Sequence, residues 1–303
     1  MLFNSMTFAF FLPVVFILYW IVPKEKQWLV IMIASCIFYI SWNPKYIILI
    51  AVTVIASYAC AICIVKYAGF KRLFLALAVI ICMSLLVIFK YFQFLLETIR
   101  LAFSESSIPL ISIVLPVGIS FYTFQTMSYV IDVYKEKVKP EYHLGIYTAF
   151  IMFFPQLVAG PIERAENLLP QIRKKHEFNY NSAVKGIKLM TWGYFKKLVI
   201  ADNLATHVDV VYNNIDSYTG LALVVATVFF AFQIYCDFSG YSDIARGVAG
   251  LFDIHLMKNF DSPYFSSSLK EFWSRWHISL STWFRDYVYI PWGVAVGETL
   301  GNI

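Results

Sequence analysis

The sequence predicts an all-α protein that crosses a membrane several times, and its composition and charge distribution support this. Of its 303 residues, 60% are hydrophobic and only 14% are charged, whereas a soluble domain carries roughly 25% charged residues. The charges are clustered, so long uncharged runs separate them, and the mean hydropathy is +0.67. Runs of about 20 apolar residues fit transmembrane helices, whereas the strands of a membrane β-barrel would alternate over about 10 residues.

The first half of the chain divides into five predicted spans. They cover approximately residues 3–22, 28–42, 46–65, 73–96 and 110–133. Pro23 follows the first span, and Asn43 begins an Asn-Pro turn after the second. A polar loop is expected at 97–109, and Pro116 and Gly118 lie within the fifth span.

The basic residues predict that the N-terminus lies outside the cytoplasm. This orientation places the following residues on the cytoplasmic side: Lys24, Lys26, Lys66, Lys71, Arg72, Lys135, Lys137 and Lys139. The opposite loops then carry only Lys45 and Arg100. The N-terminus lacks a basic region and a small-residue cleavage site, so the first span should be retained. The loops account for the net charge of +5, which therefore does not indicate nucleic-acid binding.

Residues 144–162 break the pattern of simple spans. Basic residues flank them on both sides, and their end contains two prolines, a glycine and Gln156. Irregular backbone at membrane depth is tolerated only where protein or a watery cavity covers it. We therefore expect a re-entrant element that enters from the cytoplasm, returns, and lines an internal cavity. A proline kink in an ordinary span remains the alternative.

Residues 163–235 are expected to form four elements, which precede a polar segment of the chain. The elements expected there are a cytoplasmic polar loop at 163–188 with a short amphipathic helix, a helix over 183–201 carrying Lys196 and Lys197, an acidic loop at 202–219, and a span over 220–235.

The chain stays polar after this last span, where a membrane helix should still be apolar. Gln233 and Asp237 share a helix face, Gly240 and the preceding serine should loosen the helix, and Asp243 can pair with Arg246. Acidic groups inside a membrane are costly and commonly mark a substrate path. A structural salt bridge that holds two helices together is the other interpretation, and one site can serve both purposes.

The motif at 264–291 is rich in tryptophan, and its residues 266–291 are amphipathic when drawn as a single helix. One stripe contains Leu269, Phe272, Trp273, Trp276, Leu280, Trp283, Phe284 and Tyr287. The opposite face is polar and includes an i,i+4 pair of Glu271 and Arg275. His277 lies at the edge of the aromatic stripe. A titratable imidazole at a membrane surface is the first candidate for chemistry.

The cysteines and the other histidines give weaker signals. Cys60-x-x-Cys63 has the spacing of a metal or redox site, but no second pair or nearby histidine accompanies it. Small apolar side chains are the preferred interpretation, and no metal is expected. Solvated positions in polar loops are expected for His143, His176 and His207, and an interfacial position for His255 beside Asp253.

Four motifs resemble those of the membrane-bound O-acyltransferase (MBOAT) family. They are LPVGISFYTFQ at 115–125, FPQLVAGP at 154–161, DFSGYSD at 237–243 and FWSRWHISLS at 272–281. The resemblance covers essentially the whole chain and is strongest for the bacterial branch that acetylates alginate. The sister branch transfers D-alanine to lipoteichoic acid.

The resemblance implies a single membrane-embedded domain over 1–303, with a ring of tilted helices around a thinned centre and a tunnel. It implies an enzyme of the bacterial cytoplasmic membrane that takes an acetyl group from a thioester co-substrate, such as acetyl-CoA or a carrier-protein thioester, with no bound cofactor. The acceptor would be a hydroxyl of an exported polysaccharide, reached directly or through an extracytoplasmic acyltransferase partner. Tunnel residues would include Gln156, Asp237, Asp243, Arg246, Trp273, Arg275 and Trp276.

The resemblance also limits the role of His277. This residue matches the first histidine of the family, whereas the principal catalytic histidine lies in a later Leu-Trp-His-Gly-like motif, which is expected beyond Ile303. The chain therefore resembles the N-terminal part of an acyltransferase, with His277 in a supporting role. A D-alanyl transferase, an inactive scaffold and a transporter-like subunit remain alternatives. The transporter is disfavoured because no inverted repeat is visible.

Overall fold

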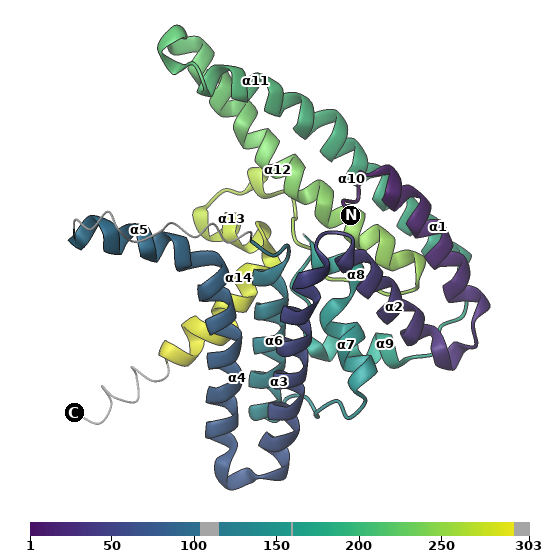
Figure 1. The fold of residues 1–303 in the computed structure, drawn as a ribbon. Coiled ribbons are helices and arrows are strands. Elements are labelled where there is room, and N and C mark those ends of the chain that lie inside the picture. Colours follow the sequence, from purple (N-terminus) through teal and green to yellow (C-terminus); the bar gives the residue numbers. More distant parts are fainter. Residues whose placement is uncertain (104–114, 159, 294–303) are drawn as a thin grey trace. The chain divides into compact units, whose positions relative to one another are not determined.

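The computed structural model describes residues 1–103, 115–158 and 160–293. All regular elements in these residues are helices (Figure 1), which confirms the all-α prediction. The chain divides into two compact units. The first comprises Met1–Gln27, Ala159–Glu163 and Lys175–Ile303, and the second Trp28–Val158 and Arg164–Lys174.

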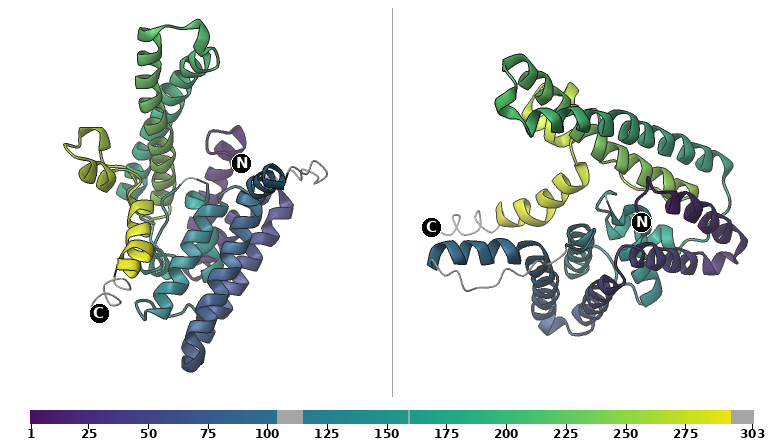
Figure 2. Two further views of the ribbon diagram at one scale, coloured as in Figure 1. Left: turned by 90° about the vertical axis from the view of Figure 1, so that its left-hand side faces the viewer. Right: turned by 45° about the horizontal axis from the view of Figure 1, so that its top comes forward.

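A long helical hairpin dominates the first unit. One arm contains α10 (Tyr180–Tyr194), a π-helical segment η5 (Phe195–Ala201) and α11 (Asp202–Tyr212), which follow one another without a gap. The other arm, α12 (Gly220–Leu251), returns beside it (Figure 2). Since α12 has 32 residues, it is about 48 Å long and exceeds the roughly 30 Å hydrocarbon core of a bilayer.

Two predictions about this hairpin are wrong. The acidic loop expected at 202–219 is helical as far as Tyr212, and Lys197 Nζ, 2.8 Å from Asp202 Oδ1, compensates the first of its acidic charges. The helix is not loosened at Gly240, since α12 runs through this position.

The glycines of the hairpin allow its two arms to approach closely. A Cβ atom on Gly193 would lie 2.7 Å from the Gly240 carbonyl oxygen, and one on Gly186 would lie 2.7 Å from the Gly247 carbonyl oxygen. Small residues serve this purpose where helices cross in membranes. The close contact between the two arms therefore explains why a glycine stands at position 240 within a regular helix.

The remaining helices of the first unit are short, apart from α1 (Met6–Ile21). They are α13 (Leu269–Arg275), α14 (Ile278–Phe284), the π-helical η8 (Arg285–Tyr289) and the 3-10 turns η1 (Lys24–Lys26), η6 (Ile215–Ser217) and η7 (Pro263–Phe265). The single amphipathic helix expected over 266–291 is wrong. Trp276 is extended and His277 is left-handed with φ +44°, so the chain breaks between α13 and α14.

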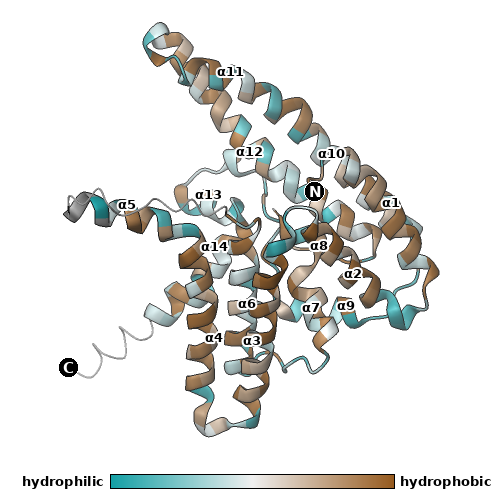
Figure 3. Ribbon diagram, in the orientation of Figure 1, coloured by the Kyte–Doolittle hydropathy of each residue, from teal (hydrophilic) through white to brown (hydrophobic). Residues whose placement is uncertain are grey.

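The second unit contains a run of largely apolar helices (Figure 3). They are α2 (Gln27–Ile40), α3 (Ile47–Lys66), α4 (Lys71–Leu86), η4 (Val87–Tyr91), α5 (Phe92–Phe103) and α6 (Ile119–Tyr134), with 3-10 turns η2 (Pro44–Tyr46) and η3 (Ala68–Phe70). Helices α3, α4 and α6 pack against one another.

Three helices of the described residues are long and apolar enough to cross a membrane. They are Pro44–Lys66, Ala68–Thr98 and Gly220–Leu251. They confirm the predicted spans at 46–65, 73–96 and 220–235 as helices of the right length. Shorter apolar helices cover Met6–Ile21 and Leu144–Leu157.

The boundaries around α6 differ from the prediction. The helix begins at Ile119, after Gly118 at φ +75°, so residues 115–118 of the span predicted over 110–133 are not helical. A Cβ atom on Gly118 would lie 2.2 Å from the Leu157 carbonyl oxygen, which explains the glycine. The polar loop expected from 97 is helical up to Phe103. Residues 104–114 lie outside the described residues.

The break predicted within 144–162 is confirmed. Helix α7 (Leu144–Met152) ends at Phe153, and α8 (Phe154–Leu157) is a single turn. Phe150, Phe153 and Phe154 are fully buried, so protein covers this irregular backbone as expected. The re-entrant path itself remains a prediction, as does the outside position of the N-terminus. The short amphipathic helix expected after it is α9 (Ala165–Arg173), whose apolar side chains are buried.

Candidate active site

A buried charge cluster lies midway along the hairpin of the first unit. Lys196 Nζ lies 2.6 Å from Asp243 Oδ2 and donates a hydrogen bond to Ser239 Oγ at 3.0 Å. Arg246 Nη1 lies 3.2 Å from Asp243 Oδ1. This confirms the predicted pairing of Asp243 with Arg246 and adds Lys196, which is only 6% exposed. The carboxylate therefore receives two cations from two different helices.

A second ion pair lies next to this cluster. Lys197 Nζ is 2.6 Å from Asp237 Oδ1 and 2.8 Å from Asp202 Oδ1. Since an uncompensated charge is costly away from water, the two acids flagged in the sequence needed cationic partners. The signal that identifies these partners is the pair of consecutive lysines within an otherwise apolar helix. The arrangement fits a structural bridge between helices and leaves the functional interpretation open.

His277 packs against aromatic rings of the same unit and is half-buried. Its ring centroid is 4.6 Å from that of Phe238 in an edge-to-face arrangement and 6.4 Å from that of Phe260 in a nearly parallel one. Burial lowers the pKa of His277 from its ordinary value of 6.5 to about 4. The imidazole is therefore neutral at pH 7. A neutral imidazole can accept a proton, which an imidazolium cannot.

The backbone of His277 is held in an unfavourable conformation. Its φ of +44° and ψ of 55° are left-handed, which costs a non-glycine residue about 1–3 kcal/mol. Asn259 fixes the turn, because its carbonyl oxygen accepts from Ile278 N at 2.9 Å and its Oδ1 from Ser279 N at 3.3 Å. Ser279 Oγ accepts from Ile162 N at 3.1 Å. The segment after the break at 154–161 therefore supports the turn that presents His277.

The aromatic residues of the tryptophan motif separate into two environments. Trp276 packs edge-to-face on Phe260 at 5.0 Å and stacks on Phe272 at 5.5 Å, so Phe260 contacts both Trp276 and His277. Trp273 is 57% exposed. The predicted pair of Glu271 and Arg275 is confirmed at 2.6 Å.

The structure brings together some of the predicted tunnel residues. Asp243 and Arg246 share one cluster, and Asp237 belongs to the adjoining pair. Gln156 belongs to the second unit, where its Nε2 donates to Gln125 Oε1 at 2.6 Å, and both side chains are buried. The tunnel itself remains a prediction.

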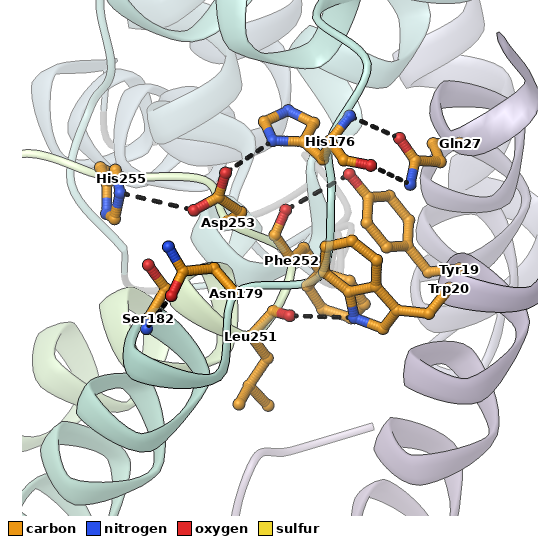
Figure 4. A network of polar contacts seen from close by, with 10 residues as sticks. All are labelled: Tyr19, Trp20, Gln27, His176, Asn179, Ser182, Leu251, Phe252, Asp253 and His255. Carbon is orange, nitrogen blue, oxygen red and sulfur yellow. Dashed lines mark hydrogen bonds and ion pairs between the residues drawn. The ribbon is translucent and has the colours of Figure 1, made fainter. Parts of the chain in front are cut away.

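His176 belongs to a polar network at the base of the hairpin (Figure 4). Its Nδ1 lies 3.1 Å from Asp253 Oδ2, and its backbone exchanges two hydrogen bonds with the Gln27 side chain. His176 is only 3% exposed, so the solvated position expected for it is wrong. Tyr19 and Trp20 donate to the carbonyl oxygens that precede Asp253, which fastens α1 to the end of α12.

The other histidines are exposed. His255 Nε2 lies 4.0 Å from Asp253 Oδ1, and its side chain is 72% exposed. His143 caps α7, where its Nδ1 accepts from Ile146 N. His207 lies on α11 and therefore not in a loop. Within residues 1–103, 115–158 and 160–293, no three histidine, cysteine or acidic side chains form a metal-binding group.

The long apolar helices define an all-α membrane protein, in which paired charges lie along the hairpin and a neutral histidine packs against aromatic rings. A family model described as "MBOAT, membrane-bound O-acyltransferase family" matches residues 136–300. This is more than half of the chain, and the chain belongs to this family.

Named relatives show the same affiliation. The peptidoglycan O-acetyltransferase of Helicobacter pylori is 36% identical over 97% of this chain and 62% of its own length. The probable alginate O-acetylase AlgI of Pseudomonas aeruginosa is 38% identical over 99% of this chain and 58% of its own length. The teichoic acid D-alanyltransferase of Bacillus subtilis is 31% identical over 57% of this chain and 44% of its own length. The chain spans about three-fifths of the length of the first two relatives.

Proposed function

We propose that the whole protein to which this chain belongs is an O-acetyltransferase of the bacterial cytoplasmic membrane. It transfers acetyl groups from a thioester to hydroxyls of an exported polysaccharide. The observation that carries the proposal is a neutral, half-buried histidine on a strained turn, in a chain of the MBOAT family. Relatives named for the O-acetylation of alginate and of peptidoglycan support a polysaccharide acceptor.

The proposed reaction needs a base and a dry site. The hydroxyl oxygen attacks the thioester carbonyl, so a C–O bond forms and the C–S bond breaks. The hydroxyl proton passes to a neutral imidazole, and the departing thiolate takes up a proton. Water must be excluded, because it would otherwise hydrolyse the thioester. The aromatic rings of Phe238 and Phe260 cover part of the His277 ring and so limit the access of water to it.

His277 has a supporting role in this proposal. A base with a pKa of about 4 accepts a proton only weakly at pH 7, since catalytic bases work best with a pKa near the operating pH. It is suited to donate or accept a hydrogen bond that orients the hydroxyl or the acyl carbonyl. The principal base that the family resemblance implies lies outside residues 1–303.

The hairpin ion pairs have a positioning role. Lys196, Asp243 and Arg246 connect the two arms across a region that must stay fixed while substrate passes. The co-substrate is acetyl-CoA or an acetylated carrier protein on the cytoplasmic side. The acceptor is reached directly or through an extracytoplasmic acyltransferase partner. The orientation with an outer N-terminus belongs to this proposal.

The test measures transfer of labelled acetyl groups. Membranes that contain the whole protein are incubated with labelled acetyl-CoA and either alginate or peptidoglycan, and label in the polysaccharide is counted. The expected result is incorporation that His277→Ala lowers at least about tenfold, because a hydrogen bond to a group that becomes charged contributes about 1.5–3 kcal/mol. His207→Ala is the matched control, since His207 is exposed on α11. Equal transfer by both variants would remove His277 from the mechanism.

The same assay separates the alternative functions. Incorporation of labelled D-alanine from its carrier protein, without incorporation of acetyl groups, would favour the teichoic-acid branch, which one relative represents at 31% identity. No transfer of either group by correctly inserted wild-type protein would favour a scaffold. Solute uptake into vesicles without acyl transfer would favour a transporter-like subunit.

A further inference from the structure

A cationic pocket opens at the base of the hairpin, and Arg246 belongs both to its lining and to the Lys196 cluster. Its volume is about 300 Å³, which is at the lower end of the range for small-molecule sites. Ser182 and Lys185 of α10 form one side, and Arg246 of α12 and His255 form the other. We refer to it as the basal pocket.

The lining of the basal pocket is positively charged. Lys185 and Arg246 are cationic, His255 becomes so when protonated, and the described lining residues include no carboxylate. Lys185 is exposed, and the His255 side chain is 72% exposed, so both can rearrange around a ligand. Two nearby acids lie outside the lining. Asp243 contacts Arg246 at 3.2 Å, and Asp253 lies 4.0 Å from His255.

Arg246 keeps donors available despite these contacts. Its Nη1 binds Asp243, and its Nε donates to the Leu256 carbonyl oxygen at 3.5 Å, whereas a guanidinium has five N–H donors. Asp243 is also bound by Lys196 at 2.6 Å, so its negative charge is shared between two cations. Asp243 therefore neutralises only part of the positive charge that Arg246 presents to the pocket.

The start of α10 adds to this cationic environment. Asn179 caps the helix by accepting from Ser182 N at 3.1 Å, which places Ser182 in the first turn (Figure 4). The first turn of a helix favours an anion. Phosphate is the anion that this combination suits best, because it accepts hydrogen bonds in several directions and arginine recognises it well.

We propose that the basal pocket binds a phosphate group. Two kinds of molecule can supply it: the head group of an anionic phospholipid, or the nucleotide part of the thioester donor. The second source rests on the proposed function, and the first does not. The basic residues around α10 place the pocket on the cytoplasmic side under the positive-inside rule, where both molecules are found.

The test measures binding without an activity readout, so its failure is distinct from failure of the proposed transferase activity. The whole protein is purified into nanodiscs of phosphatidylcholine. In one arm, phosphatidylglycerol is added and lipid retention is measured by native mass spectrometry. In the other arm, a nucleoside bisphosphate is titrated by calorimetry. Binding in at least one arm is expected, and the arm identifies the source.

The variants locate the binding. Lys185→Gln should weaken binding about tenfold, because it removes one of the two permanently charged cations of the lining. Lys188→Gln is the matched control, because Lys188 is an exposed lysine on the same helix that does not line the pocket. Loss of affinity in Lys188→Gln equal to that in Lys185→Gln, or no binding in either arm, overturns the proposal.

Discussion

The hairpin ion pairs and the His277 turn both keep polar groups inside the first unit, but they do so by opposite means. In the hairpin, Lys196 lies in the π-helical segment η5 and Asp243 in the regular helix α12, and each charge is met by an opposite one. At the turn, the histidine is uncharged, its surroundings are aromatic and its backbone is strained. Charge pairing stabilises the first region, whereas the second depends on surrounding packing and on the hydrogen bonds of Asn259.

The difference suggests a division of labour. Regular helices joined by ion pairs form a rigid frame, and strained residues cluster where function requires an unusual geometry. Substitutions in the hairpin should therefore reduce stability more than they alter chemistry. Substitutions at the turn should reduce activity with smaller effects on stability.

The largest effect is expected when Lys196 is replaced. In Lys196→Met, Asp243 loses its contact at 2.6 Å while remaining mostly buried. Breaking a buried ion pair from one side costs about 3–5 kcal/mol, and Arg246 Nη1, which stays 3.2 Å from Asp243 Oδ1, keeps the loss near the lower end of this range. The midpoint temperature of unfolding in detergent should fall by many degrees. The control is Lys258→Met, whose partner Asp261 is 58% exposed and lies outside the hairpin, so its effect should be about 1 kcal/mol or less. Equal effects would contradict the contrast between the two lysines.

Close helix packing in the hairpin gives the next largest effect. Gly193→Ala places a Cβ atom 2.7 Å from the Gly240 carbonyl oxygen, and such overpacking costs about 1–3 kcal/mol. Thermal unfolding of the purified protein measures it. Gly220→Ala is the control, because nothing lies within 4 Å of its added Cβ. If Gly193→Ala were as stable as Gly220→Ala, the two arms would be farther apart than described.

Much of this frame is predictable from the sequence, and the reason is physical. Long apolar runs must be helical in a membrane because every backbone group needs an internal partner, so α3, α4 and α12 follow from hydropathy. The acids Asp237 and Asp243 stand out for the same reason, since charge is costly there. Their partners Lys196 and Lys197 are visible as a lysine pair, but pairing between distant segments depends on how the hairpin folds.

The His277 turn could not be predicted in the same way. The stripe of Leu269, Trp273 and Trp276 has helical spacing, and nothing in it indicates a break. The break depends on Asn259 and Ile162, which are far away in sequence and hold the residues after His277. The burial of His176 was missed for a similar reason, because Gln27 and Asp253 reach it from distant parts of the chain.

A smaller loss of stability is expected at the support of the turn. Ser279→Ala leaves the buried Ile162 N–H without its acceptor at 3.1 Å, which costs about 1–3 kcal/mol. Because the turn presents His277, transfer activity should fall more steeply than this cost alone implies. Ser281→Ala is the matched control, since Ser281 Oγ donates to the Trp276 carbonyl oxygen within the same segment. Equal activity in the two variants would show that His277 does not depend on Ser279.

The smallest effect is the pH dependence of stability caused by His277. Its pKa is about 4 in the folded protein and 6.5 when exposed, so the unfolded state binds the proton first as the pH falls. Stability should therefore be unaffected by this group above pH 6.5 and decrease between pH 6.5 and 4, by at most about 1.4 kcal/mol per pH unit. Unfolding midpoints measured across this range in wild type and His277→Gln test it, because the variant should lack this contribution. Parallel curves would mean that the ring is solvated, and the contrast between an uncharged turn and a charged hairpin would then fail at its central residue.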